Sequence, residues 1–336
     1  MLCRGTGGAV TEEAILDVRG LSVRFAMPRR SLFGERPYLH AVRDVSFTLK
    51  PGRTLGLVGE SGSGKTTTAM AAIRLVAASA GTVMFEGSDL FKLDPEAMRE
   101  HRRHLQVIFQ DPYSSLNPRE RVGTIVREPL DLMAPETSKA DRESRVRELF
   151  GLVGLRPDQI ALFPHQFSGG QRQRISIARA LATHPRLIIC DEPVSALDVA
   201  IQAQILNLLR RLQDDYGLSY LFISHDLGVV QFICDDIAVM YLGEIVEFAD
   251  RPNLFSRPRH PYTAALLSAA PSLTRRKSAG YVRKGMVRGD PPSPMNIPAG
   301  CAFASRCPQA QPKCRKERPE LRHDTQGSIA CHYPLV

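Results

Sequence analysis

The sequence predicts an α/β fold in which a largely parallel sheet is covered by helices on both faces. Two observations support this prediction. Short apolar runs such as residues 187–190 and 220–223 alternate with helical segments, and the run at residues 54–58 leads through a glycine-rich turn into an alanine-rich helix. Continuous apolar strands that alternate with helices are typical of parallel sheets buried on both faces.

The N-terminal elements are expected in the order strand, strand, strand and helix. Residues 15–18, 42–49 and 54–58 are rich in β-branched and other apolar side chains, which favours strands. The alanine-rich segment at residues 66–76 is expected to form the helix that follows the glycine-rich turn.

A helical lobe is expected to interrupt the sheet. After another strand at residues 105–109, the polar segments at about residues 111–184 contain several prolines and predict a mainly helical subdomain. Strands return at residues 187–190 and 220–223. Between them, five apolar side chains share one face of an amphipathic helix: Ile201, Ile205, Leu208, Leu209 and Leu212.

The composition is that of an ordinary globular protein with a basic charge. The 336 residues are 43% hydrophobic and 24% charged, with a formal net charge of +9. The densest basic stretches lie at residues 275–277 and 283–284, and only 7% of residues are aromatic, with no tryptophan. We expect no nucleic-acid partner, because a base-stacking platform needs more aromatic side chains; an anionic membrane surface or a membrane protein explains the charge as well. Without a signal peptide or a long apolar span, a cytoplasmic protein is expected.

The segment at residues 59–66, GESGSGKT, matches the phosphate-binding pattern G-x-x-x-x-G-K-[ST]. Its glycines let successive backbone N–H groups curl around phosphates, Lys65 can reach the β- and γ-phosphates, and the Thr66 hydroxyl can ligate Mg²⁺. The pattern follows an expected strand and opens an expected helix, which is the context that this function requires. The expected phosphate-binding residues are Gly59, Ser61, Gly62, Ser63, Gly64, Lys65, Thr66 and Thr67.

Polar side chains follow three of the expected strands. Asp191 and Glu192 end the strand at residues 187–190; Asp191 suits Mg²⁺, usually through water, and Glu192 can polarise an attacking water. Gln110 and His225 each follow a strand as well. Alone, either one could be a surface amide or a structural histidine, so their interpretation depends on the phosphate loop.

The stretch FSGGQRQR at residues 167–174 lies where a helix is expected to begin. Ser168 and Gln171 have the spacing of a capping box, and Gly169 and Gly170 leave the backbone bare. The positive end of the helix dipole and its unpaired N–H groups favour an anion at this point.

Together these elements resemble an ATP-binding cassette (ABC) ATPase, a P-loop NTPase, over about residues 15–255. The resemblance rests on six motifs in the family's order and spacing: the phosphate loop, a Q-loop at Gln110, the signature at residues 168–171, the pair Asp191 and Glu192, a D-loop (SALD) at residues 195–198, and a switch histidine at His225. It implies a RecA-like, mainly parallel core, an antiparallel β part and a helical subdomain within residues 1–255. Phe167 departs from the leucine that is more frequent at the first signature position.

The resemblance also implies where ATP and Mg²⁺ bind. Two cassettes would face head to tail, so that Ser168, Gly169, Gly170 and Gln171 contact the ATP held by the partner subunit, with Asp198 in the D-loop nearby. The glycines would be needed because a Cβ atom would block the phosphate. Mg²⁺ would be bound through Thr66, Gln110 and Asp191, and the implied catalytic residues are Glu192, His225 and Gln110. An aromatic side chain is expected to stack on adenine; Phe25 is best placed, with Phe33 and Tyr38 as alternatives.

The C-terminal region, residues 256–336, resembles the tail of oligopeptide and dipeptide importer ATPases, a branch that also includes some nickel importers. The segments HPYT at residues 260–263 and YSSLNPR at residues 113–119 fit this branch. Four cysteines, Cys301, Cys307, Cys314 and Cys331, crowd into the tail, and in a cytoplasmic chain such a cluster favours metal over disulfides. Their spacing is not the usual one for zinc. We expect a [4Fe–4S] cluster, with zinc or unligated thiols as alternatives.

The resemblance implies the ATP-hydrolysing subunit of an importer for peptides or similar small solutes, on the cytoplasmic face of the inner membrane. The implied partners are a second ABC ATPase subunit, favoured as a related chain that makes a heterodimer, two integral membrane permease subunits and an extracytoplasmic solute-binding protein. These other subunits, not this chain, would select the solute. Two competing hypotheses are a soluble ABC protein of DNA repair or the ribosome, and an iron–sulfur sensor with a vestigial ATPase. The single phosphate loop disfavours the first, and the intact catalytic residues disfavour the second.

Overall fold

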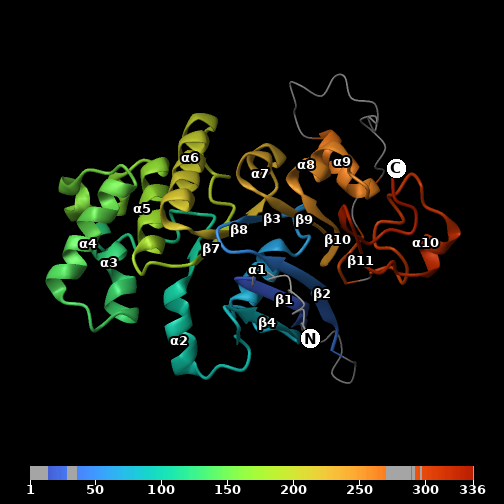
Figure 1. Ribbon diagram of the computed structural model, residues 1–336, viewed down its shortest axis with the longest axis horizontal. Coiled ribbons are helices and arrows are strands. Elements are labelled where there is room, and N and C mark those ends of the chain that lie inside the picture. Colours follow the sequence, from blue (N-terminus) through green and yellow to red (C-terminus); the bar gives the residue numbers. More distant parts are fainter. Residues whose placement is uncertain (1–13, 29–35, 270–288, 290–291, 296, 336) are drawn as a thin grey trace, which may run out of the picture.

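Two β-sheets form the centre of the molecule, as the computed structural model shows (Figure 1). It describes residues 14–28, 36–269, 289, 292–295 and 297–335. Phe33, Cys3 and the basic stretches at residues 275–277 and 283–284 lie outside the described residues. In spatial order, the larger sheet contains β11 (Arg322–Asp324), β12 (Gly327–Ile329), β10 (Glu244–Asp250), β9 (Asp236–Tyr241), β3 (Thr54–Val58), β8 (Ser219–Ser224), β7 (Leu187–Asp191) and β6 (Leu105–Ile108).

The larger sheet confirms the predicted α/β class. Its strands β9, β3, β8, β7 and β6 are paired in parallel. Because the carboxyl ends of parallel strands meet at one edge, the loops after β3, β6, β7 and β8 lie together there. This edge therefore collects the phosphate loop, Gln110, Asp191 with Glu192, and His225.

A smaller antiparallel sheet packs against this core. Its strands are β2 (Tyr38–Leu49), β1 (Leu16–Ala26), β4 (Ala80–Phe85) and β5 (Ser88–Asp89), in that order. The first two strands are longer than the predicted residues 15–18 and 42–49. Their outer ends, residues 24–26 and 38–41, are not buried, and buried residues alternate with more exposed ones in their inner parts. Alternation is the pattern of a sheet with one buried face.

The central strands separate two hydrophobic cores. Leu55, Leu57 and Leu221 face a core shared with β1, β2, β4 and the helix α1. Tyr220 and Phe222 face the opposite core, which is closed by the helices of the inserted lobe and by α6 and α7.

The helices of the described residues are α1 (Lys65–Ala72), α2 (Pro95–His104), α3 (Val122–Met133), α4 (Lys139–Leu152), α5 (Gly169–Leu181), α6 (Val199–Tyr216), α7 (Leu227–Ile233), α8 (Arg251–Ser256), α9 (Pro261–Ala269) and α10 (Pro312–Lys316), with 3-10 turns η1 (Pro157–Ala161) and η2 (Pro164–Gln166).

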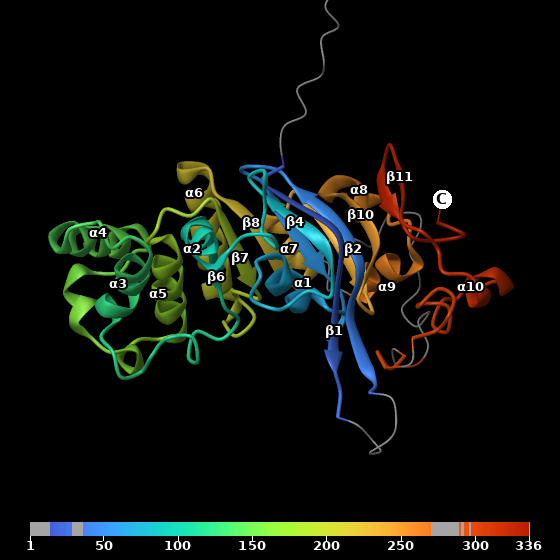
Figure 2. The same ribbon diagram turned by 90° about the horizontal axis from the view of Figure 1, so that it is seen from below.

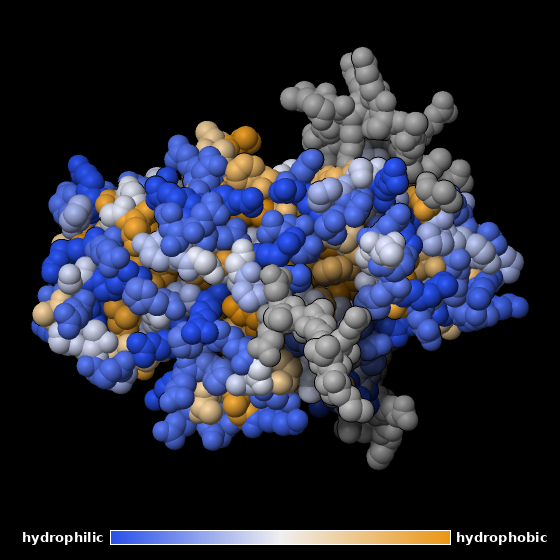
Figure 3. Space-filling view, in the orientation of Figure 1, coloured by the Kyte–Doolittle hydropathy of each residue, from blue (hydrophilic) through white to orange (hydrophobic). Residues whose placement is uncertain are grey.

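The helical lobe and the C-terminal tail lie at opposite ends of the long axis (Figures 1 and 2). Helices α3, α4 and α5 form the lobe. At the other end, β12 pairs antiparallel with β10 and extends the larger sheet with tail residues. Hydrophilic residues cover most of the face shown in Figure 3. Among the described residues, no helix combines the length and apolarity that a bilayer span requires.

Candidate nucleotide-binding and catalytic site

The phosphate loop connects β3 to α1 and is shaped by Gly64, the N-cap of α1. Gly64 has φ +99°, and a Cβ atom there would lie 2.4 Å from the carbonyl oxygen of Ala41, so both the backbone angle and the space require glycine. Lys65 follows directly, and its Nζ donates to the carbonyl oxygens of Gly59 (2.9 Å) and Glu60 (3.0 Å). The loop thus holds its lysine by its own backbone.

Lys65 is a buried cation, with 6% of its surface exposed. Burial lowers its pKa, and the negative charges of Glu192, Asp191 and Glu60 oppose that shift. A cation enclosed in this way interacts more strongly with a phosphate than a lysine in water does, because the local dielectric constant is low.

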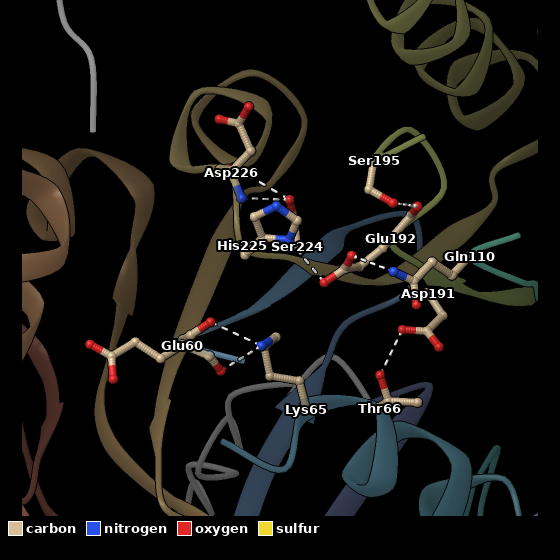
Figure 4. A network of polar contacts seen from close by, with 11 residues as sticks. Glu60, Lys65, Thr66, Gln110, Asp191, Glu192, Ser195, Ser224, His225 and Asp226 are labelled. Atoms are coloured by element: carbon tan, nitrogen blue, oxygen red, sulfur yellow. Dashed lines mark hydrogen bonds and ion pairs between the residues drawn. The ribbon is translucent and has the colours of Figure 1, made fainter. Parts of the chain in front are cut away.

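Thr66 and Asp191 meet beside the loop, although 125 residues separate them in the chain. The Thr66 hydroxyl donates to Asp191 Oδ1 at 2.8 Å (Figure 4). Burial raises the pKa of Asp191, while the bond from Thr66 lowers it. A buried carboxylate beside a hydroxyl and the amide of Gln110 is a donor set of oxygens that fits Mg²⁺.

The Glu192 carboxylate contacts two polar side chains that follow the ends of neighbouring strands (Figure 4). Gln110 Nε2 donates to its Oε2 at 2.9 Å, and His225 Nδ1 lies 3.0 Å from its Oε1. Glu192 has φ +46°, a left-handed conformation that costs a non-glycine residue roughly 1–3 kcal/mol. This turn directs the Glu192 carboxylate toward Gln110 and His225, where a base can orient and deprotonate a water molecule.

These side chains border one cavity of about 720 Å³. The predicted residues that line it are Phe25, Ser61, Gly62, Gly64, Lys65, Thr66, Thr67, Gln110, Glu192 and His225. Gly59 and Ser63 of the phosphate loop, and Asp191 at the end of β7, do not line it. Of the aromatic candidates, Phe25 lines the cavity and Tyr38 does not.

Sequence reasoning missed six further residues of the cavity wall: Leu39, His40, Ala41, Leu242, Gly243 and Pro294. They come from β2, from the turn between β9 and β10, and, for Pro294, from the part of the tail before its cysteines. No phosphate-binding or catalytic pattern marks them in the sequence. Only the packing of the small sheet and the tail against the loop brings them to the site.

The signature segment lies apart from this cavity, since none of residues 168–171 lines it. Ser168 is the N-cap of α5: its hydroxyl accepts from the Gln171 N–H at 3.4 Å, and the Gln171 side chain accepts from the Ser168 N–H at 3.0 Å. The predicted capping box is confirmed. Asp198 caps α6 in turn, accepting from the Ile201 N–H at 3.0 Å.

The two signature glycines differ in their surroundings, which leads to a stability prediction. A Cβ atom on Gly170 would lie 2.6 Å from Ile201 Cγ2, whereas one on Gly169 would come no closer than 3.5 Å to Leu197 Cδ2 and 3.8 Å to the Tyr113 hydroxyl oxygen. Gly170→Ala is expected to lower the free energy of unfolding by about 1–2 kcal/mol, because the stiff Ile201 side chain must shift. Gly169→Ala is the matched control and should leave stability unchanged or slightly raised. Urea unfolding of both variants measures this; equal stabilities would contradict the expected clash.

The four tail cysteines all line one small cavity, together with His260, Phe303 and His332. Burial raises the pKa of Cys301 to about 12 and that of Cys331 to about 11, with smaller contributions from the neighbouring cysteines. A bound metal ion or cluster would have to displace these protons, because its cysteine ligands are thiolates. Within the described part of the chain, no three His, Cys, Asp or Glu side chains are arranged to bind one metal ion. This arrangement does not fit a single zinc ion.

Comparisons with known proteins agree with this geometry. The family model of the ABC transporter matches residues 42–195, and that of the oligopeptide/dipeptide transporter C-terminal region matches residues 246–314. The oligopeptide transport ATP-binding protein AppF of Bacillus subtilis is 46% identical over 96% of this chain and 98% of its own. OppF of Escherichia coli is 47% identical, with the same coverage.

A solved structure shares the fold and some of the sequence. The dimeric ATP-binding cassette MJ0796, in a post-hydrolysis state bound to ADP and Pi, aligns with a TM-score of 0.62 and 27% identity. It covers 70% of this chain and 98% of that one.

Proposed function

This chain belongs to the ABC transporter family, in its branch of oligopeptide transport ATP-binding proteins, and from that premise we propose that it is the ATPase subunit of a peptide importer. It binds and hydrolyses ATP to drive uptake of oligopeptides, dipeptides or similar small solutes across the membrane. One observation carries the proposal: the motifs for phosphate, Mg²⁺ and water activation converge on the carboxyl edge of one sheet.

Each group at this edge has a chemical task in the proposal. The backbone of residues 59–66 and the Lys65 ammonium bind the β- and γ-phosphates, and Phe25 stacks on adenine. Thr66, Gln110 and Asp191 hold Mg²⁺, which neutralises phosphate charge when bound. Glu192 takes a proton from the attacking water, and His225 and Gln110 orient the Glu192 carboxylate.

The signature supplies the second half of a site in a partner cassette. In this proposal, Ser168, Gly169, Gly170 and Gln171 direct the N-terminus of α5 at the γ-phosphate bound by the partner, near Asp198. Support comes from the position of the capped helix end, which does not line the cavity of its own chain. ATP then joins two cassettes, and its hydrolysis separates them.

An importer ATPase of this family works with membrane permeases and a solute-binding protein, and it lies peripherally on the inner face of the membrane. We further propose that the partner cassette is a related second ATPase and that the permeases are two chains.

We propose that the ATPase domain comprises residues 1–255, with its helical subdomain at about residues 111–184, and that the tail comprises residues 256–336.

The four cysteines carry a narrower proposal, a [4Fe–4S] cluster in the tail. It is supported by four thiols that line one cavity. The cluster would brace the tail, since transport needs no redox step. Binding it would require the side chains of Cys301, Cys307, Cys314 and Cys331 to turn toward one point and lose their protons.

Purification of the complex from native membranes tests the proposed function. With a tag on this chain, we expect two permease subunits and a second ATPase to co-purify, and ATP hydrolysis to rise when a peptide-loaded binding protein is added. A chain that purifies without any membrane subunit would contradict the importer role.

The same preparation made without oxygen should contain about four iron and four sulfide ions per chain. A preparation that contains zinc, or that contains no metal, would contradict the proposed cluster and leave the proposed ATPase function unaffected.

A further inference from the structure

Glu60, the second residue of the phosphate loop, has a backbone and a side chain with different tasks. Its carbonyl oxygen accepts from Lys65 Nζ at 3.0 Å, on the side of the nucleotide cavity. Its carboxylate points the opposite way, away from Lys65 (Figure 4). Nothing in the phosphate-binding pattern asks for a carboxylate at this position, which the pattern leaves open.

The partner of that carboxylate comes from the tail, 246 residues further along the chain. Arg306 Nη1 donates to Glu60 Oε2 at 2.8 Å, and Nη2 donates to Oε1 at 3.0 Å. This is a bidentate pair in which the Arg306 side chain is 9% exposed and the Glu60 side chain 32%, so water screens the pair only in part. The Arg306–Glu60 pair therefore differs from the fully exposed ion pairs elsewhere on the molecule, which contribute little to stability.

Aromatic side chains fix the guanidinium and the loop together. The Arg306 carbon Cζ lies 5.8 Å from the ring centres of both Tyr241 and Phe303, and Nη1 lies 3.3 Å from the Tyr241 hydroxyl. Tyr262 packs against both rings, at 4.6 Å and 5.4 Å between centroids. Its hydroxyl accepts from the Glu60 N–H at 2.8 Å. Two tail residues therefore bind Glu60: Tyr262 binds its N–H, and Arg306 binds its carboxylate.

We propose that Arg306 is a positioning residue for ATP binding, which it supports by holding the Glu60 carboxylate away from the phosphate site and fixing the carbonyl oxygens that orient Lys65. The inference rests on the proposed function, because it concerns the same nucleotide site. It gives the tail a role in the ATPase reaction. No group of the tail need touch ATP for this.

The charge of Glu60 bears directly on ATP binding. ATP brings several negative charges to the loop that contains Glu60, and an unpaired carboxylate there would repel them. The charge of Glu60 already acts at Lys65, where it opposes the lowering of the pKa by burial. Pairing with Arg306 neutralises this carboxylate and directs it outward, so that the loop presents N–H groups and one ammonium to the phosphates.

The experiment measures ATP affinity by titration calorimetry on the full-length chain and ATPase kinetics on the assembled transporter. Arg306→Met should raise the Kd and KM for ATP about tenfold, with kcat changed less than about twofold, because Glu192 and His225 are untouched. Glu60→Gln in the same chain should restore affinity close to that of the parent, since the unpaired charge is gone. If Arg306 only stabilised the fold, Glu60→Gln would not restore the ATP affinity of the Arg306→Met chain.

Arg259→Met is the matched control. Arg259 forms another bidentate pair in the tail, with Asp324 at 2.9 Å and 2.6 Å, that does not involve the phosphate loop, so ATP affinity should not change. If Arg306→Met does not fold, Arg306→Lys replaces it, with an expected weakening of about threefold from the lost fork geometry. An unchanged affinity in the Arg306 variant, or no rescue by Glu60→Gln, overturns the inference. A parent chain that binds no ATP would instead overturn the proposed function.

Discussion

Replacing Glu192 with Gln is expected to slow ATP hydrolysis by about 10²–10³-fold while ATP remains bound. The substitution keeps the shape of the side chain and can keep hydrogen bonds to Gln110 and His225, but an amide cannot accept a proton from water. The Lys65 and Thr66 contacts stay intact, so binding and closure should proceed and the cycle should stop before hydrolysis.

Two measurements check this prediction. Single-turnover assays with radiolabelled ATP report the chemical step, and size-exclusion chromatography with Mg²⁺ and ATP reports closure, in which the variant should elute as an ATP-bound dimer with a cassette partner. A variant that hydrolyses ATP as fast as the parent would show that Glu192 is not the base. Fast hydrolysis by a chain that never associates would contradict the shared site itself.

Lys65→Met is expected to weaken ATP binding by about 100-fold, the equivalent of about one charge-assisted hydrogen bond. Methionine fills a similar volume but leaves the phosphates without an ammonium and the carbonyl oxygens of Gly59 and Glu60 without their donor. Unlike Glu192→Gln, this variant should fail to form the ATP-bound dimer.

Calorimetric titration with ATP measures the loss, and urea unfolding separates it from a folding defect. Lys92→Met is a suitable control, because this lysine is exposed and forms its ion pair with Asp89, three residues earlier in the chain and outside the phosphate loop. The control should bind ATP as the parent does. If Lys65→Met also binds ATP with parental affinity and folds normally, the phosphate role of this lysine is wrong.

Much of the site could be predicted from the sequence because its parts are local. The turn at residues 59–66 and the capping box of Ser168 and Gln171 depend on residues within one loop or one helical turn, and the structure forms both as predicted. Helix α1 ends earlier than expected, at Ala72 and not near residue 76, because Arg74 takes a positive φ of 57°.

The long antiparallel strands were only partly predicted. Residues 24–26 of β1 and 38–41 of β2 are not buried, so no pattern of buried apolar residues marks the outer ends of these strands. Strands β11 and β12 in the tail were not predicted at all. Each is three residues long. Strand β12 pairs with the edge of β10, and β11 pairs with β12, so both depend on the assembled sheet.

The sequence by itself determined the fold class and the phosphate-loop motif, and the order and spacing of its motifs predicted the candidate groups that would act on ATP. Tertiary structure alone decided that Thr66 meets Asp191, that Gln110 and His225 meet Glu192 in its left-handed turn, and that Arg306 pairs with Glu60. These contacts join residues far apart in the chain. Strand order and packing bring them together, and neither is encoded in any short segment.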